Sequence, residues 1–187
     1  MEFMRCEKAS FSVIGKEGSS RSGAGFVQPL WAQANGHFDE VAGLARYTQE
    51  GLPEVWGAMT DFSRSFKPWE NGYTEGMYLA GVEVSSDAQP PEGWVKWSIP
   101  AFSYVYVKVG APDTFAQGLA YLKEHNLTLC GAVQEYYCVP EGGQMYLFFP
   151  VFRKQTGPCR WFSAYVLADR MRTGPKISVA PKNPVLL

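Results

Sequence analysis

The stretch Gly131–Val139, GAVQEYYCV, has the composition of a buried strand with one acidic residue, Glu135, near its centre. Apolar and aromatic side chains dominate it, and such runs predict a strand. An ionised carboxylate in these surroundings is costly to desolvate unless it is paired, hydrogen-bonded or neutralised by a raised pKa. Glu135 therefore either points into solvent or serves a ligand.

Strand alternation divides the side chains of this stretch between two faces of a sheet. One face carries Val133, Glu135 and Tyr137, and the other carries Gln134, Tyr136 and Cys138. Tyr137 is therefore the residue expected to share a site with Glu135. In an apolar cleft the pKa of Glu135 should rise, which suits either proton transfer or the binding of a cation.

An earlier part of the chain is similar to this stretch and indicates an internal repeat. VWGAMTDF at 55–62 aligns with LCGAVQEY at 129–136, and MYLAGVEV at 77–84 aligns with MYLFFPVF at 145–152. Asp61 then matches Glu135, and Tyr78 matches Tyr146. The alignment predicts two acids related by a pseudo-twofold axis. It also predicts that the two tyrosines either both line a cleft or both pack against helices.

The elements around the two stretches follow the order strand, helix, strand, strand, twice. We expect strands at 5–18, 54–64 and 77–85 around a helix at 29–46, and strands at 94–110, 127–140 and 144–154 around a helix at 111–126. Neither unit can bury both of its faces alone. The sequence therefore predicts an α+β fold in which two tandem, pseudo-symmetric β-α-β-β modules form one domain.

Composition and charge narrow the class of function. The 187 residues are 46% hydrophobic and 15% aromatic, which fits a globular chain with a large core or a pocket that stacks flat or cationic ligands. Residues 1–153 hold 11 basic and 17 acidic side chains, a net charge of −6, whereas 154–187 hold six Lys or Arg and one acid. An acidic body fits a cation or a neutral ligand better than direct binding of nucleic acid.

Several motifs are missing from the sequence. None of the four cysteines lies in a C-x-x-C pair and there are only two histidines, so we expect no metal site and no cofactor. The start of the chain lacks an apolar leader, and no run of 18 apolar residues occurs, which predicts a cytoplasmic protein without a membrane span.

The order of the elements, together with two longer stretches, resembles the GyrI-like small-molecule-binding family. This family includes the effector-binding domains of AraC-type and MerR-type bacterial regulators. The stretches are MYLAGVEVSSDAQPPEGWVKWSIPAFSYVYVKVG at 77–110 and GAVQEYYCVPEGGQMYLFFPV at 131–151. The resemblance implies a domain at 1–153 with a ligand cleft at the pseudo-twofold axis, in a form without a helix-turn-helix. The basic extension at 154–187 has no counterpart and no assigned role.

The resemblance also implies candidate site residues. Several such domains hold bulky hydrophobic cations with an acid and a cage of aromatic side chains, and the acidic position maps onto Glu135. The candidate ligand-binding residues are Glu135, Tyr137, Trp69, Tyr73, Tyr78, Tyr146, Trp31 and Asp61. Each has a structural alternative: Glu135 exposed or paired with Lys or Arg, Asp61 linked to Arg64 or Lys67, and the aromatic residues in the core.

Three functions remain open. The leading prediction is a stand-alone cytoplasmic protein that binds drug-like or effector molecules that are hydrophobic, some of them cationic. The second is a hydrolase of strained, cyclopropane-type alkylating molecules, with Glu135 as catalytic acid and base and Tyr137 as an assisting proton donor. The third is an interaction module for a regulator or a gyrase-type protein partner.

Overall fold

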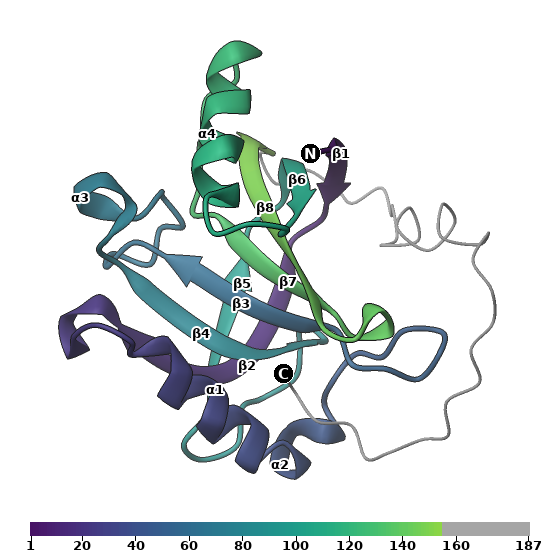
Figure 1. The fold of residues 1–187 in the computed structure, drawn as a ribbon. Coiled ribbons are helices and arrows are strands. Elements are labelled where there is room, and N and C mark those ends of the chain that lie inside the picture. The colour runs from purple at the N-terminus through teal and green to yellow at the C-terminus, as the bar shows by residue number, and fades with distance from the viewer. Residues whose placement is uncertain (155–187) are drawn as a thin grey trace.

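Eight strands form one antiparallel sheet in the computed structural model, which describes residues 1–154 (Figure 1). The strands are β1 (Phe3–Lys8), β2 (Phe11–Ser19), β3 (Val55–Thr60), β4 (Met77–Val84), β5 (Val95–Ile99), β6 (Phe102–Lys108), β7 (Gln134–Cys138) and β8 (Gln144–Arg153). The helices are α1 (Val27–Gly36), α2 (Asp39–Ala42), α3 (Glu70–Tyr73) and α4 (Thr114–Glu124). The predicted α+β class is confirmed. The extension expected at 154–187 lies, apart from Lys154, outside the described residues.

The two modules meet in the middle of the sheet, whose order is β1-β6-β8-β7-β3-β4-β2-β5. The first module supplies β2, β3 and β4, and the second supplies β6, β7 and β8. At the seam between them Gly57 of β3 lies opposite Glu135 of β7, and Val55 lies opposite Tyr137. β1 lies immediately before β2 in the chain, and β5 lies immediately before β6. Each of these two strands pairs with a strand of the other module: β1 pairs with β6, and β5 pairs with β2.

Two of the expected long strands are bent, and the bends close the sheet on itself. The strand expected at 5–18 is β1 followed by β2, and the strand expected at 94–110 is β5 followed by β6. Lys8 pairs with Phe102, and Phe11 pairs with Ile99. The residue pairing between the two bent strands therefore continues in the same register on both sides of the bend. Pro100 lies at the bend and has no N–H to donate to the ladder.

The helix expected at 29–46 is also divided, because α1 ends at Gly36 and α2 begins at Asp39. A glycine followed by a residue with non-helical backbone, His37, interrupts the helical hydrogen bonds at this point. The apolar side chains of both short helices still face the sheet, with Leu30, Ala34 and Val41 buried. The sequence therefore predicted helical structure in this segment correctly and the length of the helix wrongly.

The closed sheet has an inner and an outer face with different contents. The inner face encloses an aromatic core: Phe11, Trp56, Phe66, Trp97, Phe102, Tyr104, Tyr106, Tyr136, Tyr146 and Phe148. On the outer face α1 and α2 cover the first module and α4 covers the second, in two separate hydrophobic clusters. Figure 1 shows α4 at one end of this face and α1 and α2 at the other.

Candidate functional site

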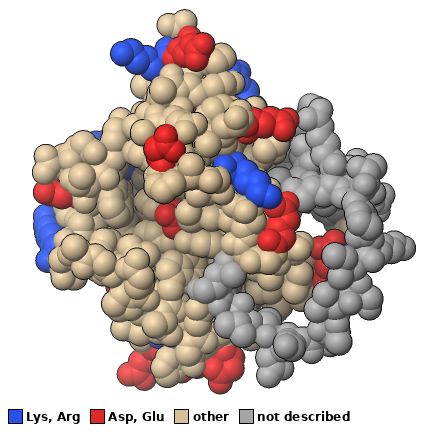
Figure 2. Space-filling view, viewed as in Figure 1, with Lys and Arg blue, Asp and Glu red and all other residues tan. Residues whose placement is uncertain are grey.

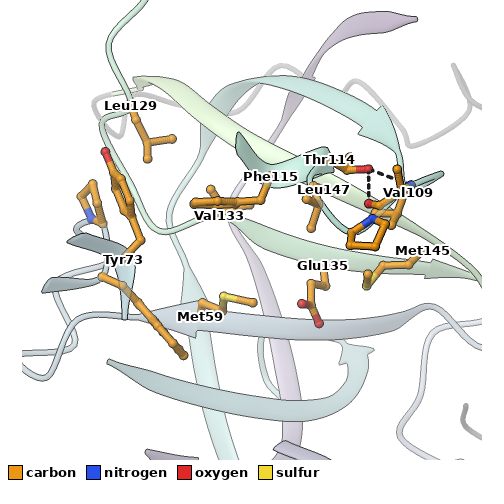
Figure 3. Close-up of a pocket in the computed structure, with 14 residues that line it drawn as sticks. Met59, Tyr73, Val109, Thr114, Phe115, Leu129, Val133, Glu135, Met145 and Leu147 are labelled. Carbon is orange, nitrogen blue, oxygen red and sulfur yellow. Dashed lines mark hydrogen bonds between the residues drawn. The ribbon is translucent and has the colours of Figure 1, made fainter. Parts of the chain in front are cut away.

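A cavity of about 370 Å³ lies on the outer face, between the start of α4 and the segment that leads into α3 (Figure 3). It is lined by Met59, Pro68, Trp69, Tyr73, Val109, Ala111, Pro112, Thr114, Phe115, Leu129, Val133, Glu135, Met145 and Leu147. Among the described residues that line the cavity, Glu135 is the one that carries a charge. The volume and the apolar surface with a single charged group are typical of small-molecule sites.

The carboxylate of Glu135 is held by two tyrosines from different modules. Tyr78 of β4 donates a hydrogen bond to Oε2 over 2.5 Å, and Tyr137 of β7 donates to the same oxygen over 2.8 Å. Trp31 of α1 donates in turn from Nε1 to the hydroxyl of Tyr78, over 3.0 Å. Among residues 1–154 no hydrogen bond is formed to Oε1, and no Lys, Arg or His forms an ion pair with Glu135.

This environment changes the acidity of all three groups. Burial raises the pKa of Glu135, and the hydrogen bonds from Tyr78 and Tyr137 oppose the shift only in part. Burial and the nearby carboxylate raise the pKa values of both tyrosines, so they remain neutral donors. Within the described part of the chain, the charge of Glu135 is therefore met by neutral hydroxyls, and a cation or a proton beside Oε1 would stabilise it.

Two predicted aromatic residues line the cavity from the segment before β4. Trp69 lies against the backbone of Gly76, where a Cβ atom would overlap its ring, and donates from Nε1 to the carbonyl of Met77 over 3.2 Å. Tyr73 has a left-handed backbone, with φ of 69°, and its ring lies edge-on to Phe115 with 5.5 Å between centroids. The contact between Tyr73 and Phe115 joins the first module to α4 at the cavity.

Three further predicted residues, Trp31, Tyr78 and Tyr137, lie beside Glu135 and outside the cavity lining. The ring of Trp31 lies edge-on to Tyr137 at 5.0 Å and to Tyr78 at 6.4 Å. Tyr78 and Tyr137 bind Oε2 directly, and Trp31 contacts both tyrosines. The structure thus brings Tyr137 next to Glu135, and it assigns Trp31 and Tyr78 a supporting position.

Asp61 lies elsewhere, just beyond the end of β3. Its carboxylate accepts hydrogen bonds from the hydroxyls of Ser63 and Ser65 and from the backbone N–H of Lys67. Burial opposes its ionisation, but these hydrogen bonds outweigh burial and lower the pKa of Asp61 to about 2. The side chain of Arg64, an alternative partner, binds Glu17 instead.

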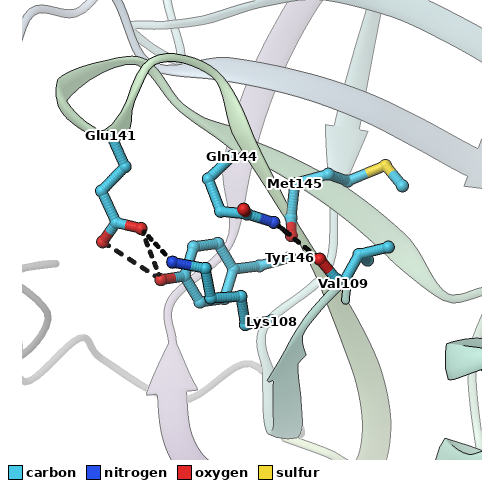
Figure 4. A network of polar contacts seen from close by, with 6 residues as sticks. All are labelled: Lys108, Val109, Glu141, Gln144, Met145 and Tyr146. Carbon is cyan, nitrogen blue, oxygen red and sulfur yellow. Dashed lines mark hydrogen bonds and ion pairs between the residues drawn. The ribbon is translucent and has the colours of Figure 1, made fainter. Parts of the chain in front are cut away.

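Tyr146 points to the inner face of the sheet, away from the cavity. It lies in the aromatic core, and its hydroxyl donates to Glu141, which also pairs with Lys108 over 3.0 Å (Figure 4). Its neighbours in β8, Met145 and Leu147, face the cavity. The expectation that Tyr78 and Tyr146 occupy equivalent places is therefore wrong, because the short Met-Tyr repeat falls on opposite faces of the sheet.

Sequence reasoning missed most of the apolar lining. Met59 and Leu147 lie on strands, Val133 immediately precedes β7, and Phe115 lies in the first turn of α4. Alternation places Val133 on the face of Glu135, whereas Met59, Leu147 and Phe115 have the sequence pattern of ordinary core residues, and no local signal separates them from the core. Figure 3 shows the side chain of Glu135 between those of Met59 and Met145.

Three other features of residues 1–154 bear on function: the surface charge, any group of metal-binding side chains and any helix able to span a membrane. The face shown in Figure 2 consists mostly of residues other than Lys, Arg, Asp and Glu, and its basic side chains are scattered. The described part of the chain contains no group of three His, Cys, Asp or Glu side chains placed to hold a metal ion. None of its helices has the length and apolar content needed to cross a membrane.

Comparison with known proteins relates the chain to others through its fold. No family model matches the sequence, and no curated protein sequence matches it. SAV2435 bound to tetraphenylphosphonium is similar with a TM-score of 0.55 and 13% identity, over 81% of this chain and 94% of the other. The C-terminal domain of EcmrR is similar with a TM-score of 0.51 and 15% identity, over 82% of this chain and 98% of the other.

An integron cassette protein from the mobile metagenome of Vibrio cholerae is similar with a TM-score of 0.51 and 14% identity, over 81% of this chain and 95% of the other. Identities at this level concern the fold alone. The similarities agree with the GyrI-like fold that the sequence resemblance implies.

Proposed function

We propose that this chain binds hydrophobic cations of small-molecule size in the cavity that contains Glu135. One observation carries the proposal: within residues 1–154, a carboxylate whose hydrogen-bond donors are all neutral opens onto an apolar cavity with no other charged lining residue. A hydrophobic cation would bury apolar surface against the lining and place its charge beside Oε1. The structure of SAV2435 with tetraphenylphosphonium supports this, because a protein of similar fold holds such a cation.

In this proposal each residue has a defined role. Trp69, Tyr73 and Phe115 offer ring faces and edges to the ligand, which favours flat or multi-ring groups. Glu135 supplies the counter-charge, and Tyr78 and Tyr137 keep its carboxylate oriented. Because a bound cation favours the ionised form of Glu135, the affinity should increase with pH up to the raised pKa of this group and then level off.

The test compares a cation with a neutral molecule of similar shape. Tetraphenylphosphonium and triphenylphosphine oxide would be titrated by calorimetry into wild-type protein and into Glu135→Gln. We expect the substitution to weaken cation binding by about tenfold or more and to leave the neutral molecule unaffected. Glu141→Gln is the matched control, since Glu141 is a part-buried, tyrosine-bonded carboxylate outside the cavity. Equal loss for both ligands in Glu135→Gln would refute the proposal.

A second candidate function is hydrolysis of a strained ring, favoured by the raised pKa of Glu135 and its two adjacent hydroxyls. Protonated Glu135 would give its proton to the ring carbon that leaves as the C–C bond breaks. Water would form the new C–O bond and return a proton to Glu135, so the enzyme ends unchanged. The measurement is product formation from a cyclopropane-type alkylating molecule. Stoichiometric binding without turnover would leave only the first function.

A further inference from the structure

Tyr78 reaches Glu135 by crossing the strand between them. Tyr78 belongs to β4 and Glu135 to β7, and β3 lies between these two strands. The tyrosine side chain crosses at Gly57, which lies opposite Ala80 of β4 and Glu135 of β7. A Cβ atom at position 57 would overlap the Tyr78 hydroxyl and would lie 2.7 Å from Oε2 of Glu135. The absence of a side chain at this point therefore allows the hydrogen bond.

The hydrogen bond from Tyr78 is the second step of a chain of donors. Trp31 of α1 donates from Nε1 to the Tyr78 hydroxyl over 3.0 Å, and this hydroxyl donates to Oε2 of Glu135 over 2.5 Å. A hydroxyl that accepts one hydrogen bond is polarised by it and donates a stronger one. Tyr78 is 1% exposed, so water has little access to either bond.

This chain acts on the ionisation of Glu135. Burial favours the protonated carboxyl, whereas hydrogen bonds donated to the carboxylate favour the ionised one. The charge of a permanent cation is stabilised by Glu135 only while the carboxyl is ionised. Each hydrogen bond to Oε2 therefore extends cation binding to a lower pH and leaves Oε1 open to the ligand.

Few other titratable groups face Glu135 from the elements around it. Within residues 1–154, those that bind it or line its cavity are Tyr73 of α3, Tyr78 of β4 and Tyr137 of β7. The residues that β3, β8 and α4 contribute to the described lining are Met59, Thr114, Phe115, Met145 and Leu147, which do not titrate. The tyrosine hydroxyls on Oε2 are thus the polar groups of the described chain that oppose the effect of burial.

We infer that the hydrogen-bond chain from Trp31 through Tyr78, which Gly57 allows across β3, keeps Glu135 ionised for the binding of a cation. This inference rests on the proposed function and assigns Trp31 and Gly57 to its site as positioning residues. Neither lines the cavity, and both act through Tyr78. Because Tyr78 and Glu135 belong to different modules, the site is complete only where the two modules meet.

The experiment follows the ionisation of Glu135 in two ways. Carbon-13 NMR gives the titration midpoint of its carboxyl group in the free protein, with the signal assigned by its loss in Glu135→Gln. The affinity for tetraphenylphosphonium, which is charged at every pH, gives a second midpoint between about pH 4 and pH 9. In Tyr78→Phe both midpoints should rise by about one pH unit, and in Trp31→Phe by about 0.3 unit. Gly57→Ala should raise them as Tyr78→Phe does, because the added methyl group displaces the same hydroxyl.

A purely structural role would weaken binding equally at every pH and leave both midpoints in place. Tyr73→Phe is the matched control, since it removes a hydroxyl from the cavity lining that forms no hydrogen bond with Glu135 among the described residues. Midpoints that stay fixed in a folded Tyr78→Phe protein, or that move as far in Tyr73→Phe, overturn the inference. A shift in Tyr78→Phe with none in Trp31→Phe overturns the assignment of Trp31.

The two measurements also separate this inference from the proposed function. If tetraphenylphosphonium does not distinguish wild type from Glu135→Gln at high pH, the proposed function fails. If it does, and the NMR midpoint of Tyr78→Phe equals that of wild type, only the inference about the chain fails. If Gly57→Ala does not fold, Tyr78→Phe and Trp31→Phe still decide the outcome.

Discussion

Two glutamates of the sheet, Glu83 and Glu135, have opposite surroundings: the first has ionic partners and the second has neutral hydrogen-bond donors. Glu83 of β4 faces inward and is 5% exposed. It pairs with Lys8 over 2.9 Å and with Arg46 over 3.4 Å, and accepts a hydrogen bond from the indole of Trp56 over 3.2 Å. Glu135 of β7 faces outward to the cavity and receives two tyrosine hydroxyls.

The difference separates a structural carboxylate from a candidate ligand-binding one. Lys8 also lies over the rings of Phe11 and Trp56, at 4.5 and 5.1 Å, so the cation near Glu83 is built into the aromatic core. The chain thus supplies its own counter-charge at one buried acid. At the other, residues 1–154 supply orientation without positive charge, an arrangement that costs stability and is typical of functional sites.

The largest expected effect comes from removing the counter-charge of Glu83. Lys8→Met should lower the free energy of unfolding by about 3 kcal/mol, because it leaves a buried charge with one weaker ionic partner. The matched control is Lys108→Met, whose ion pair with Glu141 is more exposed and should contribute less than about 1 kcal/mol. Urea denaturation of both variants measures the difference. Equal effects would show that Glu83 is not a structural ion-pair site.

A smaller effect is expected at Asp61, whose buried carboxylate is satisfied by its own loop. Asp61→Ala should lower the free energy of unfolding by about 2 kcal/mol, because it leaves the hydroxyl and N–H donors around it unpaired. Since the folded pKa is about 2, below the ordinary 3.8, this contribution is present above pH 3.8 and is lost as the pH falls toward 2.

Denaturation at several pH values measures the Asp61 contribution, with Asp87→Ala on the exposed loop after β4 as control. Cation binding should be unchanged in Asp61→Ala, because this side chain does not line the cavity. A lost binding signal in a folded Asp61→Ala protein would show that the site extends beyond the cavity described above.

The smallest effect, and the one of opposite sign, is expected at Glu135. Its raised pKa means that the folded state favours the protonated form, so wild type loses stability relative to Glu135→Gln as the pH rises above about 4.5. At mildly alkaline pH the variant should be as stable as wild type or more stable by up to about 1 kcal/mol. Thermal denaturation of both proteins measures this. A clear loss of stability in Glu135→Gln would place Glu135 with Glu83 as a structural acid.

The order of the elements could be read from the sequence because it depends on local patterns. Runs of apolar and aromatic residues predicted the strands around Val55 and Glu135, and the order strand, helix, strand, strand was predicted for both modules from patterns of the same kind. Pro100 is a strand breaker and Gly36 is a helix breaker, and both are visible in the sequence. The sequence nevertheless predicted one long strand and one long helix, because the apolar pattern continues across both residues.

The sequence by itself determined that a carboxylate, Glu135, lies within a buried strand and shares a face with Tyr137, since alternation along one strand needs no further information. Only the tertiary structure decided that Tyr78 crosses β3 at Gly57 to reach it, and that Tyr146 faces the inner core. Those placements depend on the pairing of residues that are far apart in the chain, Gly57 opposite Glu135 and Tyr146 opposite Lys108, and a shift of one residue would exchange the two faces of the sheet.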